Sequence, residues 1–189
     1  MSKFNPFFFI LTGGPGSGKT TLLQELKKRG YSTVSETGRT IIQEQIDTNG
    51  DALPWKNKLL FAQRMLAADH KNYLQHDGAA QPIIFDRGIP DSLGYLRLSK
   101  VEEPLHSRKL ARHFRYNKIV FILPAWEAIY KNDSERKQDF ILAKETYKVM
   151  YKTYLELGYQ MVRIPKVSIC KRADNIIKAI QTIIKQGKH

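Results

Sequence analysis

A glycine-rich segment near the amino terminus carries the residue types that bind phosphate groups. Residues 13–20 are Gly-Gly-Pro-Gly-Ser-Gly-Lys-Thr, which fits the pattern G-x-x-x-x-G-K-[ST]. Such a loop directs its backbone N–H groups into one concavity, the lysine reaches the β- and γ-phosphates, and the threonine hydroxyl binds Mg²⁺. We therefore expect Mg²⁺-dependent binding of ATP, or of GTP, and these are the contacting residues: Gly13, Gly14, Pro15, Gly16, Ser17, Gly18, Lys19, Thr20 and Thr21.

A second polar group follows the apolar run Pro82–Phe85. Residues 86–91 are Asp-Arg-Gly-Ile-Pro-Asp. A carboxylate at the end of a buried strand can join the Mg²⁺ shell or accept a proton from an attacking hydroxyl, and an adjacent arginine can hold an anion through two hydrogen bonds. We therefore expect Asp86 to be catalytic and metal-binding and Arg87 to be catalytic. Asp91 fits a helix cap as well as a site role.

Two further segments supply candidate catalytic charges. Glu36 follows the predicted strand Tyr31–Ser35, where it could act as a general base or bind acceptor hydroxyls, or else only stabilise a helix start. Arg39, on the same turn, is a candidate phosphate or substrate contact. Residues 131–138 interrupt a long helical pattern; we expect a charged lid that brings Arg136 onto the transferring phosphoryl group, the alternative being a solvated turn.

Strand-like and helix-like segments alternate along the whole chain. Apolar runs predict strands at Phe7–Thr12, Tyr31–Ser35, Pro82–Phe85, Lys118–Leu123 and Tyr159–Ile164. Helical spacing predicts helices at Thr20–Arg29, Glu36–Thr48, Trp55–Gln75, Pro90–Leu98, Pro104–Phe114, Trp126–Gly158 and Arg172–Lys185. This alternation predicts an α/β, three-layer fold with a five-stranded parallel sheet flanked by helices, and residues 1–189 as one domain. The polar residues that follow strands should then meet at one edge of the sheet.

The composition is that of a soluble globular protein. Of 189 residues, 42% are hydrophobic and 26% are charged, and no apolar run approaches the roughly 18 residues that span a membrane. A single cysteine, Cys170, excludes an internal disulfide framework, and with only scattered histidines it leaves no zinc site. We expect a cytoplasmic protein without a transmembrane segment.

The positive charge is concentrated in the second half of the chain. The net charge is +13, of which residues 1–95 carry +2 and residues 96–189 carry +11. Lys144, Lys148 and Lys152 recur every four residues beside Tyr147 and Tyr151. Nucleic acid or anionic lipid could bind such a surface, but a solvated helix face is favoured because no nucleic-acid-binding motif accompanies it.

The motifs in combination resemble a known family. The loop at residues 13–20, the stretch at residues 85–91, the segment at residues 132–136 and the ending Leu157-Gly158-Tyr159 before Pro165 resemble small predicted ATPases classed as AAA-domain proteins. That group includes the kinase-like domain of NAD-biosynthesis regulators with ribosylnicotinamide kinase activity. The chain is more distantly similar to nucleoside and thymidylate kinases.

The resemblance implies a five-stranded parallel core, ATP or GTP with Mg²⁺, and a lid that carries an arginine. It also implies that Glu36 matches the acidic base after the second strand, and that Asp86 and Arg87 match the acid–arginine pair after the third. Residues 37–80 show no recognised signature for reading a nucleobase. Gln63 and Arg64 could contact the acceptor there, or could be ordinary helix-surface residues.

The sequence predicts a kinase that transfers the γ-phosphoryl group of ATP to a small nucleoside- or nucleotide-like acceptor. The alternative is an ATP- or GTP-dependent regulatory switch that hydrolyses slowly and presents its basic half to a partner. A nucleic-acid-processing ATPase is disfavoured because the chain has no obvious oligomer-sensing arginine motif.

Overall fold

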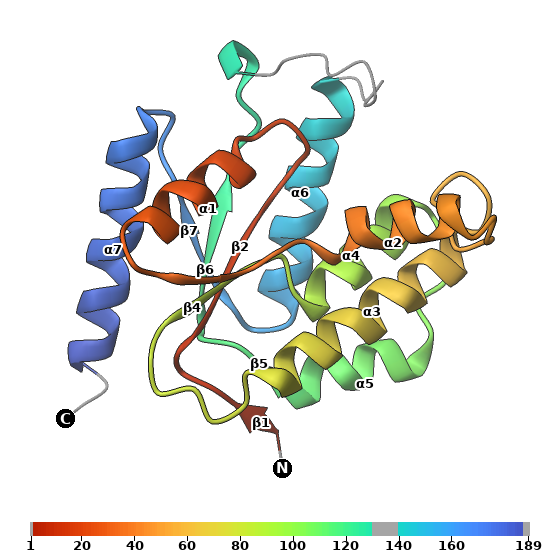
Figure 1. The fold of residues 1–189 in the computed structure, drawn as a ribbon, viewed down its shortest axis with the longest axis horizontal. Coiled ribbons are helices and arrows are strands. Elements are labelled where there is room, and N and C mark those ends of the chain that lie inside the picture. Colours follow the sequence, from red (N-terminus) through yellow and green to blue (C-terminus); the bar gives the residue numbers. More distant parts are fainter. Residues whose placement is uncertain (1, 130–139, 187–189) are drawn as a thin grey trace.

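A sheet of five parallel strands forms the centre of the protein. The computed structural model describes residues 2–129 and 140–186. The strand order is β3-β4-β2-β6-β7, and every neighbouring pair is parallel (Figure 1). The strands are β2 (Phe8–Gly13), β3 (Ser32–Val34), β4 (Ile83–Asp86), β6 (Ile119–Leu123) and β7 (Gln160–Arg163). The predicted five-stranded parallel sheet is therefore confirmed.

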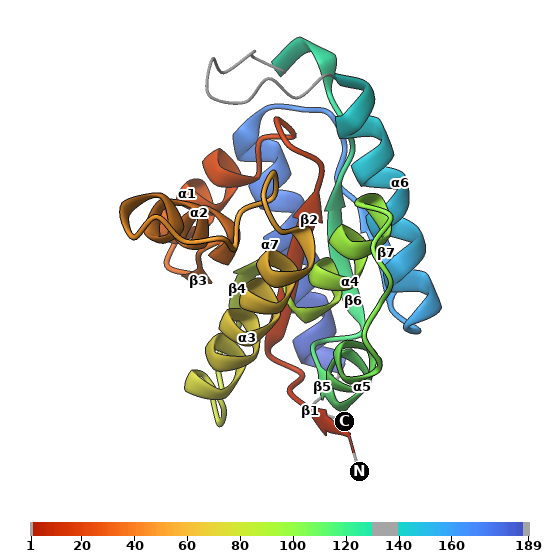
Figure 2. The same ribbon diagram turned by 90° about the vertical axis from the view of Figure 1, so that its right-hand side faces the viewer.

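Helices cover both faces of this sheet, which makes the fold three-layered (Figures 1 and 2). The helices are α1 (Lys19–Lys28), α2 (Thr37–Asp47), α3 (Lys58–Gln75), α4 (Ile89–Leu98), α5 (Leu105–His113), α6 (Phe140–Glu156) and α7 (Ile169–Gln186). Helices α1 and α7 pack together over one face, and residues of α3, α4, α5 and α6 form the core on the other. Among the described residues, no helix is long and apolar enough to cross a membrane.

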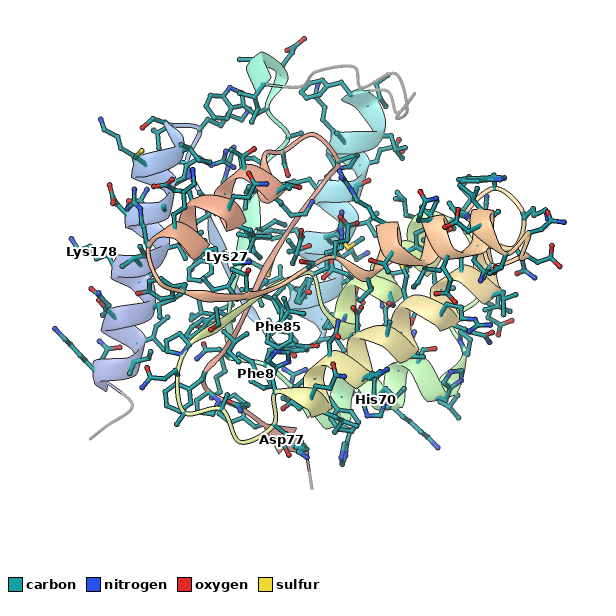
Figure 3. All side chains as sticks on the ribbon, in the orientation of Figure 1. Phe8, Lys27, His70, Asp77, Phe85 and Lys178 are labelled. Atoms are coloured by element: carbon teal, nitrogen blue, oxygen red, sulfur yellow. The ribbon has the colours of Figure 1, made fainter. Side chains whose placement is uncertain are left out.

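Alternate residues of β2 divide the core between the two faces. Phe8 and Ile10 pack into the cluster beneath α3 and α4, while Phe9 and Leu11 pack beneath α1 and α7. All four are fully buried, as expected for a parallel strand with helices on both sides. Figure 3 shows Phe8 beside Phe85 of the neighbouring strand, and their ring centroids are 4.9 Å apart.

The structure differs from the sequence expectation at several element ends. Two short strands, β1 (Lys3–Phe4) and β5 (Phe114–Arg115), pair in parallel, so Phe114 ends α5 rather than continuing it. A strand of two residues is too short to show the alternation of apolar and polar side chains that predicts a strand. Helix α7 begins three residues earlier than predicted, which places Cys170 inside it. The predicted long helix from Trp126 begins instead as a short 3-10 turn, η1 (Glu127–Ile129), and α6 begins at Phe140; the predicted break at residues 131–138 lies outside the described residues.

The glycines at the end of β2 allow β6 and α6 to approach the phosphate loop. A Cβ on Gly13 would lie 2.6 Å from the carbonyl oxygen of Leu123, and a Cβ on Gly14 would lie 2.5 Å from that of Ala143. Both obstacles are backbone atoms, which cannot move aside cheaply. The loop is therefore held between the end of β6 and the first turns of α6.

An ion-pair network joins helices α4, α5 and α6. Glu103 accepts hydrogen bonds from Arg97 and, at 2.7 Å, from Nη2 of Arg108. Arg97 also donates to Thr153 and pairs with Glu156 at 2.6 Å. Burial alone would raise the pKa of Glu103, but the hydrogen bonds from the two arginines hold it below its ordinary value of 4.5.

Folding lowers the pKa of Glu103, so the charged side chain stabilises the protein at pH values above the ordinary pKa of 4.5. This contribution is lost as the pH falls through the lowered pKa. We expect Glu103→Gln to reduce the free energy of unfolding at pH 7 by about 1–3 kcal/mol. Below pH 4.5 the difference from wild type should shrink. Urea unfolding at pH 7 and at pH 3.5 measures this. Glu102→Gln is the matched control, and an equal loss in both variants would contradict the assignment.

Candidate functional site

The phosphate loop lies between β2 and α1. Gly16 and Gly18 have φ angles of 66° and 84°, which only glycine adopts without strain, and Gly18 caps the first turn of α1. The Ser17 hydroxyl donates a 2.8 Å hydrogen bond to the carbonyl of Gly14 and closes the turn. Thr20 and Thr21 are exposed on the first turn of α1, where they are accessible to a ligand. The N–H groups and dipole of the helix start therefore favour an anion here.

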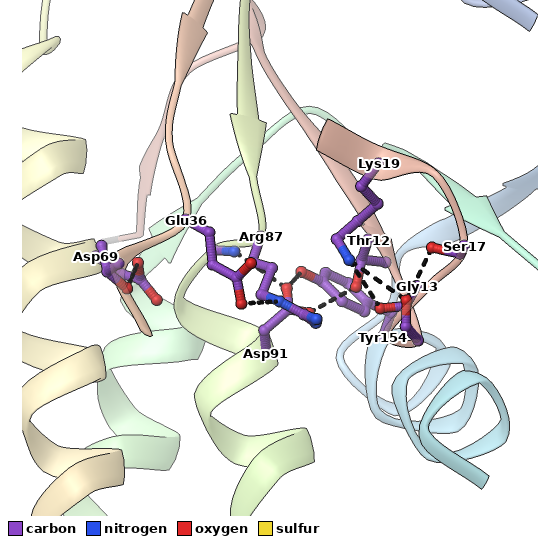
Figure 4. A network of polar contacts seen from close by, with 12 residues as sticks. Thr12, Gly13, Ser17, Lys19, Glu36, Asp69, Arg87, Asp91 and Tyr154 are labelled. Atoms are coloured by element: carbon purple, nitrogen blue, oxygen red, sulfur yellow. Dashed lines mark hydrogen bonds and ion pairs between the residues drawn. The ribbon is translucent and has the colours of Figure 1, made fainter. Parts of the chain in front are cut away.

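The Lys19 side chain folds back over the loop. Its Nζ lies 3.4 Å from the carbonyl oxygens of both Gly13 and Gly14 (Figure 4). Burial, with help from the nearby positive charge of Arg87, lowers the pKa of Lys19 from 10.5 to about 8. The carboxylates of Asp86, Glu36 and Asp91 offset this effect only in part. Within residues 2–129 and 140–186, the polar contacts of this cation are thus with backbone carbonyls and not with a carboxylate of its own.

Arg87 joins the ends of β3 and β4. Its Nε donates to Oε1 of Glu36 at 3.1 Å, and its Nη1 donates to Oδ1 of Asp91 at 3.2 Å (Figure 4). Arg87 has a φ angle of 71°, a left-handed conformation that costs a non-glycine residue about 1–3 kcal/mol. Burial alone would lower the pKa of Arg87, but Glu36, Asp91 and Asp86 raise it above its ordinary value. The guanidinium thus lies between two carboxylates, and these contacts offset the strain of the backbone.

Asp91 connects this arginine to three other elements. Its Oδ1 also accepts a 2.6 Å hydrogen bond from Thr12 of β2, and its Oδ2 accepts from the backbone N–H of Gly88 and from the Tyr154 hydroxyl of α6. Only 4% of Asp91 is exposed. The residue thus accepts from the capping residue Gly88 at the start of α4 and also contacts Arg87, while a role for Asp91 in the site stays a prediction.

Asp86 is a buried carboxylate beside the loop. Its Oδ1 has no hydrogen-bond partner among the described residues. Burial raises the pKa of Asp86, while Lys19 and Arg87 act in the opposite direction. A buried oxygen without a partner costs free energy, so it is a natural place for a ligand or cation to bind.

A carboxyl group of α3 that the sequence analysis missed completes the row of charged side chains formed by Lys19, Arg87 and Glu36. Asp69 is buried, and its Oδ1 accepts a 2.9 Å hydrogen bond from the hydroxyl of Thr37, at the start of α2 (Figure 4). Burial raises the pKa of Asp69 from 3.8 to about 8. The available signal was its spacing, because Ala62, Leu66 and Tyr73 place Asp69 on an otherwise apolar, buried stripe.

Several other candidate residues do not join this group. Arg39 and Arg64 are exposed and Gln63 is only half-buried, and in the described part of the chain none of them has a polar contact with Lys19, Arg87 or Asp91. Arg136 lies outside the described residues. Lys144, Lys148 and Lys152 are exposed on α6, which fits the interpretation of this stripe as a solvated helix face.

The residues at the loop suit a magnesium ion that is bound with a nucleotide. In the described part of the chain, no three His, Cys, Asp or Glu residues cluster in a way that could hold a metal alone. Magnesium in nucleotide sites needs only one or two protein oxygens, since phosphates and waters complete its octahedral shell. The exposed Thr20 and the Asp86 oxygen that has no partner within the described ranges fit that requirement.

Comparison with known proteins agrees with this geometry. A family model described as an AAA domain matches residues 8–172, which is most of the chain. No curated protein matches the sequence.

Solved structures of kinases share the fold. A deoxyadenosine kinase from M. mycoides superposes with a TM-score of 0.63 at 17% identity, covering 93% of this chain and 99% of that one. A thymidylate kinase from Ehrlichia chaffeensis gives 0.59 at 17%, covering 94% and 99%. NadR protein gives 0.69 at 18%, covering 93% of this chain but only 51% of NadR. At such identities the likeness establishes a P-loop kinase fold.

The lowered pKa of Lys19 has a measurable consequence for stability. Because folding depresses this pKa from 10.5 to about 8, the charged lysine destabilises the ligand-free protein below pH 8, and the cost fades as the pH rises to 10.5. We expect Lys19→Met to raise the Tm at pH 7 by about 2–4 °C and to abolish the Tm increase caused by nucleotide.

Differential scanning fluorimetry at pH 7 and at pH 10 measures both effects. Lys27→Met, at an exposed position of the same helix, is the control and should change neither value. A lower Tm for ligand-free Lys19→Met would contradict the assignment.

Proposed function

The chain belongs to the AAA-domain family, and we propose that it is a kinase that uses ATP and Mg²⁺ to phosphorylate a hydroxyl group of a small, nucleoside-like acceptor. The observation that carries the proposal is the row of Lys19, Arg87 and Glu36 at the carboxyl ends of adjacent parallel strands. Ligands of open α/β sheets bind at this edge. Arg87 thus lies between the predicted phosphate-binding loop and Glu36, the candidate base.

In the proposed reaction, the acceptor oxygen attacks the γ-phosphorus of ATP as the bond to the β-phosphate oxygen breaks and ADP leaves. Glu36 takes the proton of the attacking hydroxyl. Lys19 and Arg87 hold the negative oxygens of the transferring group, and we assign Arg136 the same task. Little covalent chemistry falls to the protein, so positioning and electrostatics provide most of the rate.

Bound Mg²⁺ would neutralise charge on the β- and γ-phosphates, with Thr20 and Asp86 as its protein ligands. Asp91 acts indirectly, because its hydrogen bonds keep Arg87 in place. We propose ATP as the donor, residues 1–189 as one catalytic domain, and the cytoplasm as the location, since the only cysteine is a free thiol.

The charges near Glu36 favour an uncharged acceptor. Among the described residues beyond Arg87, Glu36 is a carboxylate, while Asp69, whose pKa burial raises to about 8, is largely protonated at pH 7 and can donate a hydrogen bond. A phosphate on the acceptor would face these carboxyl groups, whereas sugar hydroxyls would find acceptors and donors in them. A Cβ on Gly38 would lie 3.7 Å from both Glu36 Oε1 and the Phe61 ring, so an apolar wall adjoins this base. A neutral ring with adjacent hydroxyls fits these surroundings.

Two of the fold neighbours support this acceptor class. The deoxyadenosine kinase was solved with the products dCMP and dCDP, and NadR was solved in complex with NR.

An acceptor panel tests the function. With ATP and Mg²⁺, ADP release should rise with one nucleoside or other ribose-containing compound, and its kcat/KM should exceed that of the corresponding 5′-monophosphate by at least about tenfold. Glu36→Gln keeps an oxygen that can accept from Arg87 but removes the base. We expect this variant to lower kcat by roughly 10²–10⁴-fold while the Kd for ATP stays within about twofold.

Glu44→Gln, at an exposed position of the same helix, is the matched control and should behave as wild type. If ADP release stays slow with every compound although ATP binds tightly, the kinase assignment is wrong and a regulatory switch replaces it.

A further inference from the structure

A buried arginine from the last helix touches the phosphate loop. Arg172 lies in the first turn of α7, and only 3% of it is exposed. Its Nη2 donates a 2.9 Å hydrogen bond to the carbonyl oxygen of Ser17, 155 positions earlier in the chain. A Cβ on Gly18 would lie 2.9 Å from Nη1, so the guanidinium packs directly on the loop backbone.

This guanidinium has no negative partner in the described part of the chain. None of the ion pairs there includes Arg172, and its Nε is buried without a hydrogen bond. Burial alone lowers the pKa of Arg172. Beyond the Ser17 carbonyl, its described neighbour is Trp126, whose ring centroid lies 5.8 Å from the guanidinium carbon. A buried charge without a counterion is costly, and proteins keep one mainly where a ligand supplies the missing charge.

The contact with Ser17 also fixes a peptide plane. In a trans peptide the C=O and the next N–H point in opposite directions. Holding the Ser17 carbonyl toward Arg172 therefore turns the Gly18 N–H to the other side, away from the arginine. A loop that binds phosphate through its N–H groups needs them oriented before the ligand arrives.

We propose that Arg172 is a positioning residue of the donor-nucleotide site, which holds the Ser17–Gly18 peptide in its binding orientation and whose buried charge is balanced by the bound triphosphate. This inference rests on the proposed binding of a nucleoside triphosphate at the loop. Helix α7 is well placed for this task, because Arg29 of α1 pairs with Asp174 and donates to the Cys170 carbonyl, which fixes α7 against the helix that follows the loop.

The proposal predicts an effect that depends on the charge of the ligand. Arg172→Gln keeps a polar side chain but removes the charge and, because glutamine is shorter, the hydrogen bond to the Ser17 carbonyl. We expect it to raise the Kd for ATP about tenfold and that for ADP about threefold, because the more highly charged ligand loses more. Arg172→Lys keeps the charge, so both constants should stay within about threefold of wild type. The ligand-free Tm of Arg172→Gln should equal or exceed that of wild type, since an unpaired buried charge is gone.

Trp126 can report the binding. It is one of two tryptophans, and the other, Trp55, is 64% exposed. In a Trp55→Phe background, titration with ATP or ADP follows the fluorescence of Trp126 alone, and isothermal titration calorimetry gives an independent Kd. Arg29→Gln is the matched control, because it loosens the contact between α1 and α7 without touching the loop; it should lower the Tm but leave the ratio of the two constants unchanged.

The outcomes separate the two proposals. If wild type binds ATP and Arg172→Gln shows an unchanged ratio of ATP to ADP affinity, Arg172 has no such role, although the nucleotide site stands. The inference is also overturned if ligand-free Arg172→Gln fails to fold. The same holds if this variant melts several degrees lower than wild type while Arg172→Lys binds both nucleotides poorly. In both cases the role of the arginine is structural. If wild type binds no nucleotide, both proposals fall together.

Discussion

The buried carboxylate of Asp91 is the interaction on which the rest of the site depends. It accepts hydrogen bonds from Thr12 on β2, from the start of α4, from Tyr154 on α6 and from Arg87 after β4. A buried carboxylate is tolerated only when its oxygens are satisfied, so these four groups must all arrive together. Through them the strand that leads into the phosphate loop is fixed relative to the arginine that faces it.

The groups near the loop are not balanced against one another in the ligand-free protein. Lys19 and Arg172 are buried cations whose pKa values are lowered, and Asp86 is a buried acid with an oxygen that no described residue pairs. Each of these departures costs stability in the absence of ligand. A magnesium–triphosphate complex carries both the negative charge and the cation that would relieve them. The same imbalance that lowers the stability of the fold would therefore strengthen binding.

Close backbone packing makes the loop part of a rigid frame. Gly13 lies against β6 and Gly14 lies against α6, at separations that no side chain would permit. Helix α6 in turn reaches Asp91 through Tyr154. One helix thus contacts both the loop and the residue that orients Arg87, so a shift of α6 would disturb both sides of the site.

The sequence by itself determined the glycine-rich loop between β2 and α1, the five parallel strands and the placement of Glu36 and Asp86 at strand ends. These features depend on local spacing and on the period of apolar residues. It could not place the two-residue strands β1 and β5, which have too few residues to show a pattern.

Only the tertiary structure decided that Asp91 orients Arg87, that Asp69 joins the row from α3, and that Arg172 meets Ser17 from the far end of the chain. Asp69 and Arg172 each stand on an otherwise apolar helix stripe, and spacing reveals that such a polar residue is buried. Spacing does not reveal its partner, because the partner is set by how distant elements pack and not by neighbours in the chain.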